Sequence, residues 1–591
     1  MQLDFYNLKT GDDVMVGGFA STIRDHGGLI FIDLRSEDQI LQCVIDPETN
    51  PEAFKLSESV HSEYVLKISG KIQDRTEETI NPNLPTGSIE LVISTLEIVS
   101  KAKTMPFDIQ AENKNMAGEE TRLKYRYLDF RRSKLKKMIK LRSKFILAIR
   151  NWFADRDFVD VHTPILANSS PEGARDYLIP SRLHPGKFYA LPQAPQQFKQ
   201  LLMVGGFNKY IQIAPCFRDE DPRADRAIGD FYQVDGEVAW GDEDQIYELS
   251  NSLVKEVFAK FTDKKLMHEN MPKITHTEAM NKYGSDRPDL RYELPWQDAK
   301  DIFRNSDFAV FANLCDNPKA KIQALHIKDA VTKFSRSDLD KVQDIGRQFG
   351  LPGIAYIQYF EDGAKSPIFK FLGEEKTKEL QNFFDAKTGD LILFIANENS
   401  SIVYKAQDQM RQHIARKLDL IDENLLCYVW IDGFPFFEKD DKTGVIDFAH
   451  NPFSSWQGGL DALLEAQKNG TILDLHARQY DIAVNGYEVL SGGVRNTNPE
   501  ALLKAFEVIG YTEEEVRTKF GHMLEAYEYG SPTHAGFAWG VPRNLMVLTG
   551  ETNIREVIPF PKNGSGVDPM TGSPSSVSQK QLTELNLKIT D

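Results

Sequence analysis

The sequence predicts a multidomain α+β protein with a small N-terminal β-barrel and a larger domain that is interrupted by an insertion. Three observations predict this. The chain has 591 residues, which is too long for one hydrophobic core and suggests about three to five domains. Residues 1 to about 100 read as short strands, and the stretch from about 285 to 430 alternates helices with strands. That stretch separates two segments that carry chemically informative residues, as an inserted domain would.

Five strand-like segments with turn signals between them make up the N-terminal region: DVMVGGFASTI, GLIFIDLR, QILQCVI, EYVLKISGKI and SIELVISTLEIV. One helical segment near residues 51–60 interrupts them. This strand density favours a small barrel. The OB-fold is the commonest five-stranded barrel that binds oligonucleotides, so we expect it here, although composition alone does not separate it from other small barrels.

A polar stretch broken by Pro and Gly follows the barrel and leads into a basic segment. Between Thr121 and Arg150, twelve Lys or Arg residues accompany the single acid Asp129. This segment is either the solvated face of an amphipathic helix or a contact for a polyanion. From Ser133 to about Phe158, apolar residues recur at helical spacing and predict a long helix. Pro164 then forces an extended or bent path.

A charged loop, FRDEDPRADR, lies between the predicted strands KYIQIAPCF and FYQVDGEVAW. Taken alone, such a cluster reads as a solvated loop. In the second strand, the period of two puts Phe231, Gln233, Asp235 and Glu237 on one face. An aromatic and three polar groups beside an arginine-rich loop suit the floor of a site for a cationic or planar ligand. A half-exposed edge strand is the alternative.

Two glycine-containing segments near the C-terminus also carry charged residues. DIAVNGYEVLSGGVR spaces Asp481, Glu488 and Arg495 seven residues apart, and in THAGFAWGVPRNLMVL Pro542 and Arg543 stand at the predicted start of a helix. A helix N-terminus with an arginine beside it can bind an anion, although Gly-x-x-x-Gly is a weak signal. Two carboxylates without His or Cys partners favour a hard cation such as Mg²⁺.

Composition narrows the class of protein. A formal net charge of −17 argues against a protein that coats nucleic acid through bulk electrostatics. The four cysteines are far apart, so we expect buried residues rather than disulfides or a zinc site. The N-terminal residues lack a basic start and an apolar segment, and no later run is long enough to cross a membrane. We therefore expect a cytoplasmic protein without a membrane partner.

In chain order, VDVHTP after the long helix, FRDEDPRADR with the FYQVD strand, and GFAWGVPR resemble motifs 1, 2 and 3 of class II aminoacyl-tRNA synthetases. The finer resemblance is to bacterial-type aspartyl-tRNA synthetases, through SSPEGARDYLIPSR, NGYEVLSGGVR and RDHGGLIFIDLR. It runs essentially end to end. It implies an OB-fold anticodon-binding domain (1–105), a linker (106–132), an antiparallel-sheet catalytic domain in two parts (133–284 and 426–591, with a C-terminal extension) and an inserted α+β domain (285–425).

The resemblance implies ATP as a substrate and Mg²⁺ as its metal. It assigns Arg218 to the amino-acid carboxylate and the α-phosphate, Glu220 and Phe231 to adenine, and Arg543 to the other side of the adenine ring and the γ-phosphate. Arg218, Arg543 and Glu488 are the implied catalytic residues, and Asp481 and Glu488 would hold Mg²⁺. The full implied ATP-binding set is Arg218, Asp219, Glu220, Phe231, Gln233, Glu488, Gly540, Val541, Pro542 and Arg543.

The same resemblance implies a pocket for L-aspartate. Lys199 and Arg495 would clamp the side-chain carboxylate, and Gln196 and Asp235 would receive the ammonium group. The full implied set is Glu172, Gln196, Lys199, Arg218, Asp235, His450 and Arg495. Two cations disfavour asparagine or lysine as the substrate, because either would leave buried charges imperfectly paired.

In the barrel, the resemblance assigns anticodon binding to Arg24, His26, Phe31, Gln42 and Glu90. His26 also resembles the non-discriminating synthetases, which charge both tRNA-Asp and tRNA-Asn, whereas Glu78, at a second position linked with this choice, fits neither pattern cleanly. The expected partners are therefore tRNA-Asp, tRNA-Asn, L-aspartate and a second copy of the chain.

Other readings stay open from the sequence. These are a strictly discriminating synthetase and a non-catalytic RNA-binding paralogue. The chain also departs from the family pattern, with Ala194 where Ser is usual and Pro542 where an acid is usual. The expected homodimer would form through the region around Pro164.

Overall fold

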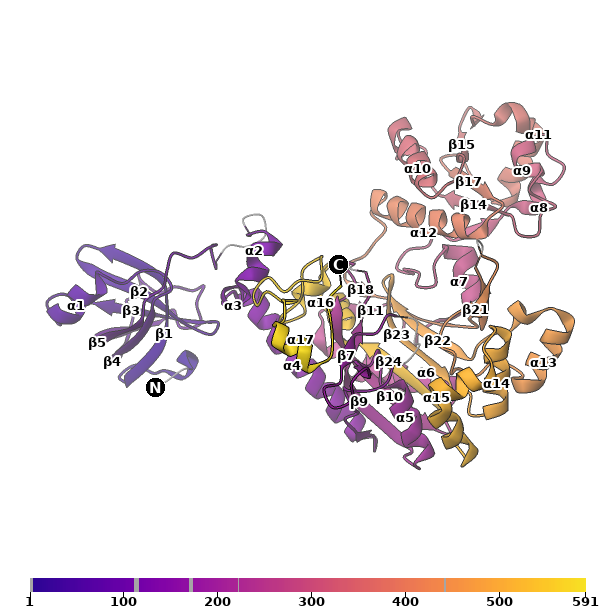
Figure 1. The fold of residues 1–591 in the computed structure, drawn as a ribbon. Helices are drawn as coiled ribbons and strands as arrows, with labels where there is room; N and C mark the ends of the chain where they lie inside the picture. The colour runs from indigo at the N-terminus through magenta and orange to yellow at the C-terminus, as the bar shows by residue number, and fades with distance from the viewer. Residues whose placement is uncertain (1–3, 111–115, 170–173, 222, 441–442, 591) are drawn as a thin grey trace. The chain divides into compact units, whose positions relative to one another are not determined.

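The structure, a computed structural model, describes residues 4–110, 116–169, 174–221, 223–440 and 443–590. The chain divides into two compact units. Unit 1 comprises Met1–Leu141 and Pro559–Ser575, and unit 2 comprises Arg142–Ile558 and Ser576–Asp591 (Figure 1).

Unit 1 contains a closed barrel with the strand order β1-β2-β3-β5-β4. Its strands are β1 (Asp13–His26), β2 (Leu29–Ser36), β3 (Gln39–Ile45), β4 (Val65–Asp74) and β5 (Ile89–Ser100), with α1 (Pro51–Ser57) between β3 and β4. β3 and β5 pair in parallel, and the other neighbouring strands pair antiparallel. Alternate residues of β2 and β4, such as Ile32, Leu34, Leu66 and Ile68, fill the core. The predicted five-stranded OB-fold barrel is confirmed.

Part of the basic segment that follows the barrel is paired with acidic residues of the chain itself. α2 (Glu119–Lys124) and α3 (Arg126–Asp129) lead to α4 (Ser133–Ala154). Asp129 is fully buried and forms ion pairs with Arg122 at 3.4 Å, Arg126 at 2.9 Å and Arg132 at 3.2 Å. Arg131 pairs with Glu63 of the barrel at 2.8 Å. Three arginines are thus buried against one acid, whereas Lys134, Lys137, Lys140 and Lys144 of α4 are exposed, as expected for a solvated helix face. Contact of this segment with a polyanion stays a prediction.

Unit 2 is built on an eight-stranded sheet with the order β12-β19-β22-β23-β24-β10-β9-β6. The two outermost pairs, β12 with β19 and β6 with β9, are parallel, and the pairs between them are antiparallel. The strands are β12 (Lys273–Thr275), β19 (Tyr428–Asp432), β22 (Gln479–Val484), β23 (Tyr487–Val494), β24 (His534–Gly540), β10 (Gly229–Ala239), β9 (Lys209–Arg218) and β6 (Val159–Asp160).

Unit 2 also contains helices outside the inserted part. They are α5 (Gln196–Val204), α6 (Glu243–Glu256), α7 (His276–Tyr283), α13 (Gly459–Asn469), α14 (Pro499–Val508), α15 (Glu513–Glu528), α16 (Val541–Thr549) and α17 (Gln579–Glu584). Short strand pairs join β7 (Leu178–Pro180) to β8 (Phe188–Ala190), β11 (Lys265–Leu266) to β18 (Leu425–Leu426), and β20 (Phe437–Lys439) to β21 (Ile446–Phe448). Among the described residues, short 3-10 helices are η3 (Phe258–Phe261), η4 (Ile472–Asp474) and η5 (Ile554–Glu556) in unit 2 and η1 (Phe5–Asn7) in unit 1.

The inserted part of unit 2 has its own five-stranded sheet, ordered β13-β14-β17-β15-β16. Its elements are β13 (Trp296–Asp298), α8 (Lys300–Phe303), α9 (Ala309–Ala312), β14 (Lys321–Ile327), α10 (Arg336–Gln348), β15 (Ala355–Phe360), β16 (Gly363–Lys365), α11 (Phe369–Phe383), β17 (Leu391–Asn397) and α12 (Ser400–Lys417). Leu325 and Leu393 pack with α10 and α12 on one face, and Ile322 and Phe394 pack with α8 and α11 on the other. The predicted alternation of helices and strands is confirmed.

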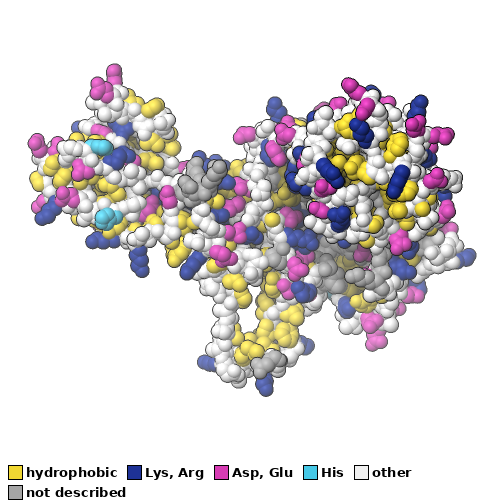
Figure 2. Space-filling view, turned by 90° about the horizontal axis from the view of Figure 1, so that it is seen from above, with side chains coloured by type: hydrophobic (Ala, Val, Ile, Leu, Met, Phe, Trp, Pro, Cys, Tyr) yellow, Lys and Arg dark blue, Asp and Glu magenta, His cyan; other side chains and the backbone are white. Residues whose placement is uncertain are grey.

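The surface charges and the cysteines are consistent with what the composition predicts. Lys and Arg side chains are interspersed with Asp and Glu on the face drawn in Figure 2, so no large area of one charge sign covers it. The four cysteines are buried and free, as expected. Across the described ranges, no helix combines the length and the apolar character that crossing a membrane requires.

Candidate active site

A cavity of about 560 Å³ lies over the central strands of the large sheet in unit 2. It brings together most of the residues that the sequence assigned to ATP and aspartate. Those lining it are Gln196, Lys199, Arg218, Glu220, Phe231, Gln233, Asp235, His450, Asp481, Glu488, Arg495, Gly540, Pro542 and Arg543. Asp219 and Val541 do not line it, and Glu172 lies outside the described residues.

The alternation of β10 places its polar face toward the cavity, as the period of two predicted. Phe231, Gln233 and Asp235 line the cavity at successive odd positions. Tyr232, between them, is exposed on the opposite face. Gln233 Oε1 lies 3.3 Å from Cys216 Sγ on β9, which orients its amide.

Four charged side chains form a buried cluster at one end of the cavity. Lys199 Nζ donates to Asp235 Oδ2 at 3.1 Å and lies 3.3 Å from Glu237 Oε2. Arg495 donates to both oxygens of Glu237, from Nε at 2.8 Å and from Nη2 at 3.2 Å. All four side chains are almost completely buried. Buried charges are stable only when paired in this way.

The two carboxyl groups of this cluster titrate differently. Burial raises the pKa of Asp235 to about 6, because the charge of Lys199 offsets the desolvation only in part. Burial would also raise the pKa of Glu237, but the charges of Arg495 and Lys199 outweigh it and lower the pKa to about 2. Glu237 is therefore a fixed anion at neutral pH, whereas Asp235 is easily protonated.

Two further side chains near this cluster are placed to contact a ligand. Gln196, on α5, is buried, and its Nε2 has no hydrogen-bond partner within the ranges that the structure describes. A buried amide donor without a partner is costly, so it suits a site that a ligand completes. His450 packs edge-on against Phe434, and burial lowers its pKa, which makes the ring neutral at pH 7.

The loop between β9 and β10 carries the charged sequence FRDEDPRADR. The Arg218 guanidinium lies 5.2 Å from the centre of the Phe231 ring, at the cavity. Glu220 forms an ion pair with Arg226 at 2.8 Å, and both line the cavity. Asp219 instead meets Arg175, with its carboxylate 3.7 Å from Arg175 Nε. The charges thus order the loop and direct Arg218 and Glu220 inward.

Arg543 enters the cavity from the first turn of α16. The helix begins directly after Gly540, with Pro542 in its first turn, as predicted. The Arg543 guanidinium donates to the backbone carbonyls of Glu488 and, at 3.3 Å, Asp225. Its Nη1 lies 4.0 Å from Glu488 Oε1. Arg543 therefore joins the charged loop to the strand that carries Glu488.

Asp481 and Glu488 come from the two strands of the β22–β23 hairpin and line the cavity together. Burial and the neighbouring Glu488 charge raise the pKa of Asp481 well above its ordinary value. Among the described residues, no third His, Cys, Asp or Glu completes a metal-binding group with them. Two carboxylates that repel each other suit Mg²⁺, because this ion prefers oxygen ligands and takes most of the others from water and phosphate.

Glycines allow the charged cluster to form across the sheet. A Cβ on Gly536 would lie 1.7 Å from Glu237 Oε2 and 2.6 Å from Arg495 Nη2. A Cβ on Gly492 would lie 2.4 Å from the carbonyl oxygen of Gly536. Any side chain at either position would collide with the site.

In the barrel of unit 1, three of the predicted anticodon residues are joined by hydrogen bonds. Arg24 donates to both oxygens of Asp33 at 2.8 Å and to Gln42 Oε1 at 3.2 Å. Gln42 Nε2 then donates to Glu90 at 2.8 Å. The structure thus joins Arg24, Gln42 and Glu90 in one hydrogen-bonded chain.

Phe31 on β2 is paired in register with Arg24 on β1, and His26 is the last residue of β1. The His26 ring is exposed and 6.2 Å from the ring of Phe31, in an edge-on arrangement. Figure 2 shows exposed histidine side chains on the barrel. Glu78 is exposed between β4 and β5. The stacking of Phe31 on a base stays a prediction.

Several residues of these sites were not assigned from the sequence. Glu237 was placed on the correct face but given no role, and Asp225 and Arg226 were treated as ordinary loop charges. In the barrel, Asp33 holds Arg24, and Gln73 donates to Glu90 at 2.8 Å. Strand alternation could have indicated Glu237, whereas the others depend on contacts between distant strands or within an irregular loop.

Comparison with known proteins agrees with this arrangement. Residues 118–564 match the family "tRNA synthetases class II (D, K and N)". Residues 14–99 match the family "OB-fold nucleic acid binding domain". The first match covers well over half of the chain.

Curated relatives are similar over nearly the whole length. The aspartate–tRNA(Asp/Asn) ligase of Chlorobaculum parvum is 46% identical, with 98% of this chain and 94% of the relative covered. The enzyme of the same name from Bradyrhizobium sp. is 44% identical, with 98% and 96% covered.

Solved structures share the fold at low identity. Asparaginyl-tRNA synthetase of Entamoeba histolytica in complex with asparaginyl-adenylate has a TM-score of 0.57 at 15% identity, covering 94% of this chain and 97% of that one. Aspartyl-tRNA synthetase of the same organism has a TM-score of 0.55 at 16% identity, covering 93% and 89%.

Proposed function

We propose that this chain, which belongs to the class II tRNA synthetase family for aspartate, lysine and asparagine, is an aspartate–tRNA ligase. It activates L-aspartate with ATP to aspartyl-adenylate and transfers the aspartyl group to the 3′ end of tRNA-Asp and also of tRNA-Asn. The relatives named aspartate–tRNA(Asp/Asn) ligase support both parts of this proposal.

The net charge of the buried cluster explains why the site would select aspartate as its amino-acid substrate. Lys199 and Arg495 supply two positive charges, and Glu237 cancels one of them. One positive charge is left for the side-chain carboxylate of the substrate, while ionised Asp235 balances its ammonium group. Asparagine would leave one buried cation unmatched and lysine would add another, and either mismatch costs roughly several kcal/mol in a dry pocket.

Activation joins two anions, so charge neutralisation and positioning supply most of the catalysis. The α-carboxylate of aspartate attacks the α-phosphorus of ATP in line, the bond to the β-phosphate oxygen breaks, and pyrophosphate leaves. Arg218 would hold the attacking carboxylate against the α-phosphate, and Arg543 would balance charge on the leaving phosphates. Phe231 would stack on adenine, and Glu220 would accept hydrogen bonds from it. No general base is needed, because the nucleophile is already ionised.

Asp481 and Glu488 are the residues that would hold Mg²⁺. The ion would supply positive charge to the phosphates of ATP. The donor set fits, because two adjacent carboxylates offer hard oxygen ligands and leave the remaining positions to phosphate and water.

In the second step, a ribose hydroxyl at the 3′ end of tRNA attacks the carbonyl carbon of the adenylate, and AMP leaves. The barrel face of Arg24, Phe31, Gln42 and Glu90 would bind anticodon bases by stacking and hydrogen bonding. His26 is exposed beside Phe31, and we assign it to the acceptance of tRNA-Asn.

Because the reaction belongs to protein synthesis, we place the enzyme in the cytoplasm.

We propose that the enzyme is a homodimer through the region around Pro164. Val159, Ile165 and Leu166 are exposed there, between 44% and 52% of their surface. On α4, Leu147 is exposed and Arg142 Nη1 is buried without a hydrogen-bond partner among the described residues. A second copy would cover the apolar side chains and give Arg142 an acceptor. A clean monomer in sedimentation would contradict this.

Pyrophosphate exchange tests the activity. With ATP and labelled pyrophosphate, exchange should require aspartate and should be absent with asparagine or lysine. The absence of any exchange would favour the non-catalytic RNA-binding alternative, and exchange that does not depend on aspartate would contradict the proposed activation of aspartate.

Aminoacylation of purified tRNA-Asn tests the dual specificity. The wild-type enzyme should charge tRNA-Asp and tRNA-Asn, and His26→Leu should lose tRNA-Asn preferentially. A wild-type enzyme that charges only tRNA-Asp would show that it is strictly discriminating.

A further inference from the structure

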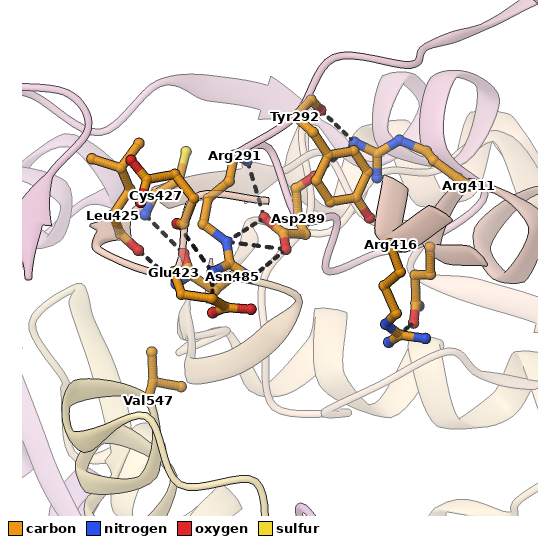
Figure 3. A network of polar contacts seen from close by, with 12 residues as sticks. Asp289, Arg291, Tyr292, Arg411, Arg416, Glu423, Leu425, Cys427, Asn485 and Val547 are labelled. Carbon is orange, nitrogen blue, oxygen red and sulfur yellow. Dashed lines mark hydrogen bonds and ion pairs between the residues drawn. The ribbon is translucent and has the colours of Figure 1, made fainter. Parts of the chain in front are cut away.

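The two chain segments that connect the inserted domain to the rest of unit 2 are tied together by one arginine (Figure 3). Arg291, on the segment leading in, donates to both oxygens of Asp289, from Nε at 3.1 Å and from Nη2 at 2.8 Å. Its Nη1 donates to Glu423 Oε2 at 2.8 Å, on the segment leading out. The Arg291 side chain is only 7% exposed. The two segments therefore cannot separate without breaking the ion pair between the buried Arg291 side chain and the exposed carboxylate of Glu423.

A second arginine fixes the leading segment from the side of the inserted domain. Arg411, on α12, is completely buried and donates to the backbone carbonyls of Asp289 at 2.6 Å, Tyr292 at 3.0 Å and Leu294 at 3.2 Å. Its guanidinium also lies 4.4 Å from the centre of the Tyr292 ring. α12 and the segment that holds Arg291 thus form one rigid base.

The turn of the β22–β23 hairpin rests on this base. Asn485 adopts a left-handed conformation with φ of 52°, and its side chain accepts from the backbone N–H of Cys427 at 2.9 Å and donates to the carbonyl of Leu425 at 2.9 Å. Leu425 and Cys427 follow Glu423 on the segment that leads out of the inserted domain. On the other side, Gly486 leaves a Cβ position only 3.7 Å from Cβ of Asp289. The turn is therefore seated on both connecting segments.

Glu488 follows this turn directly and faces the cavity. Its backbone carbonyl accepts from Arg543, so a shift of the turn would change the spacing of Glu488 and Arg543 together. Replacing a group that orients a metal-binding carboxylate commonly lowers affinity or activity about ten- to a hundred-fold.

We propose that Arg291 is a positioning residue for Glu488: by joining Asp289 to Glu423 beneath Asn485, it holds the β22–β23 hairpin where Glu488 meets the nucleotide. The inserted domain is then mechanically part of the ATP site, although its own sheet lies outside the cavity. This inference rests on the proposed function, because it takes Glu488 to act on ATP.

The test separates the use of ATP from the use of aspartate. In Arg291→Gln, KM for ATP in pyrophosphate exchange should rise about ten-fold, and saturation with Mg²⁺ should need a higher concentration, while KM for aspartate stays within about two-fold. Asn485→Gly, which keeps the left-handed turn but loses both side-chain hydrogen bonds, should show the same split. Arg304→Gln is the matched control, because Arg304 forms ion pairs with Asp301 and Asp316 inside the inserted domain and should leave both KM values unchanged.

Active-site titration and thermal unfolding account for any loss of folded enzyme. A fall in kcat with both KM values unchanged, or an equal rise in both, would show that Arg291 only stabilises the fold and would overturn the proposal. Aspartate-dependent exchange by the wild-type enzyme is measured first, so a failure of the proposed activity is seen before any variant is compared.

Discussion

Glu237 on β10 and Arg495 directly after β23 form a bidentate ion pair that spans the intervening strand β24, with contacts of 2.8 and 3.2 Å. The pair crosses β24 at Gly536, which is paired in register with Glu237. Because Lys199 also lies 3.3 Å from Glu237, a single carboxylate sets the position of both cations proposed to bind the aspartate side chain.

Replacing Glu237 should therefore damage aspartate binding selectively. In Glu237→Gln, the guanidinium of Arg495 loses its charged bidentate partner, and Lys199 and Arg495 repel each other. We expect KM for aspartate to rise about thirty-fold or more, equivalent to about 2 kcal/mol, with KM for ATP nearly unchanged, in pyrophosphate exchange.

Glu243→Gln is the control for this change. Glu243 also forms a bidentate pair with an arginine, Arg478, but the pair is partly exposed and Glu243 does not line the cavity. Its loss should change neither KM. If Glu237→Gln kept the wild-type KM for aspartate, the positions of Lys199 and Arg495 would not depend on Glu237.

The raised pKa of Asp235 predicts a pH dependence of aspartate use. With a pKa of about 6, the carboxyl group is ionised at pH 7.5 and protonated below pH about 6, where it no longer attracts an ammonium group. We expect kcat/KM for aspartate to fall about ten-fold per pH unit below that pKa, with kcat/KM for ATP flat. Pyrophosphate exchange between pH about 5 and 8 measures this.

Two variants identify the titrating group. His450→Gln should keep the inflection, and Asp235→Asn should lose it along with most of the affinity for aspartate.

The raised pKa of Asp235 also affects the stability of the folded protein. Since the folded-state pKa lies above the ordinary aspartate value of 3.8, the contribution of Asp235 to the free energy of unfolding is present below pH about 4 and is lost as the pH rises through about 6.

Local patterns predicted the strands and their faces, because the period of two is a property of neighbouring residues. Phe231, Gln233 and Asp235 were assigned to one face from the alternation alone, and they line the cavity. The partner of Glu237 could not be found in this way. Arg495 lies 258 residues further along the chain, and only the order of strands in the sheet brings the two together.

Two other cases show where proximity in sequence misleads. Asp219 lies between Arg218 and Glu220 and was assigned to the same site, but it follows the end of β9 and meets Arg175 instead. The excess of Lys and Arg around Asp129 suggested a cationic surface. The structure buries three of the arginines against that one acid. A count of charges cannot predict this, because it contains no information about which residues form ion pairs.

The hydrogen-bonded chain on the barrel predicts a residue that positions the anticodon site. Asp33 holds Arg24 by two contacts of 2.8 Å, so Asp33→Asn should release Arg24 and raise KM for tRNA-Asp about ten-fold or more. Pyrophosphate exchange without tRNA should not change. Glu97→Gln, which removes an exposed pair with Lys67 on the same barrel, should leave aminoacylation as in the wild type. Equal KM values for Asp33→Asn and the wild type would place Arg24 outside the tRNA contact.

Gly536→Ala should be one of the most damaging single methyl additions in the protein. The added Cβ would lie 1.7 Å from Glu237 Oε2 and 2.6 Å from Arg495 Nη2, so the ion pair must open or β24 must move. Opening a buried pair costs roughly 3–5 kcal/mol, and we expect a large fall in Tm together with loss of aspartate-dependent exchange. Gly540→Ala on the same strand is the control for stability, because its φ is −70° and the nearest atom to the added Cβ is 3.8 Å away. Its Tm should stay close to that of the wild type. Equal Tm values for the two variants would mean that β24 can move away from Glu237 at little cost, and the tight fit of Glu237 and Arg495 over Gly536 would not be needed for the fold.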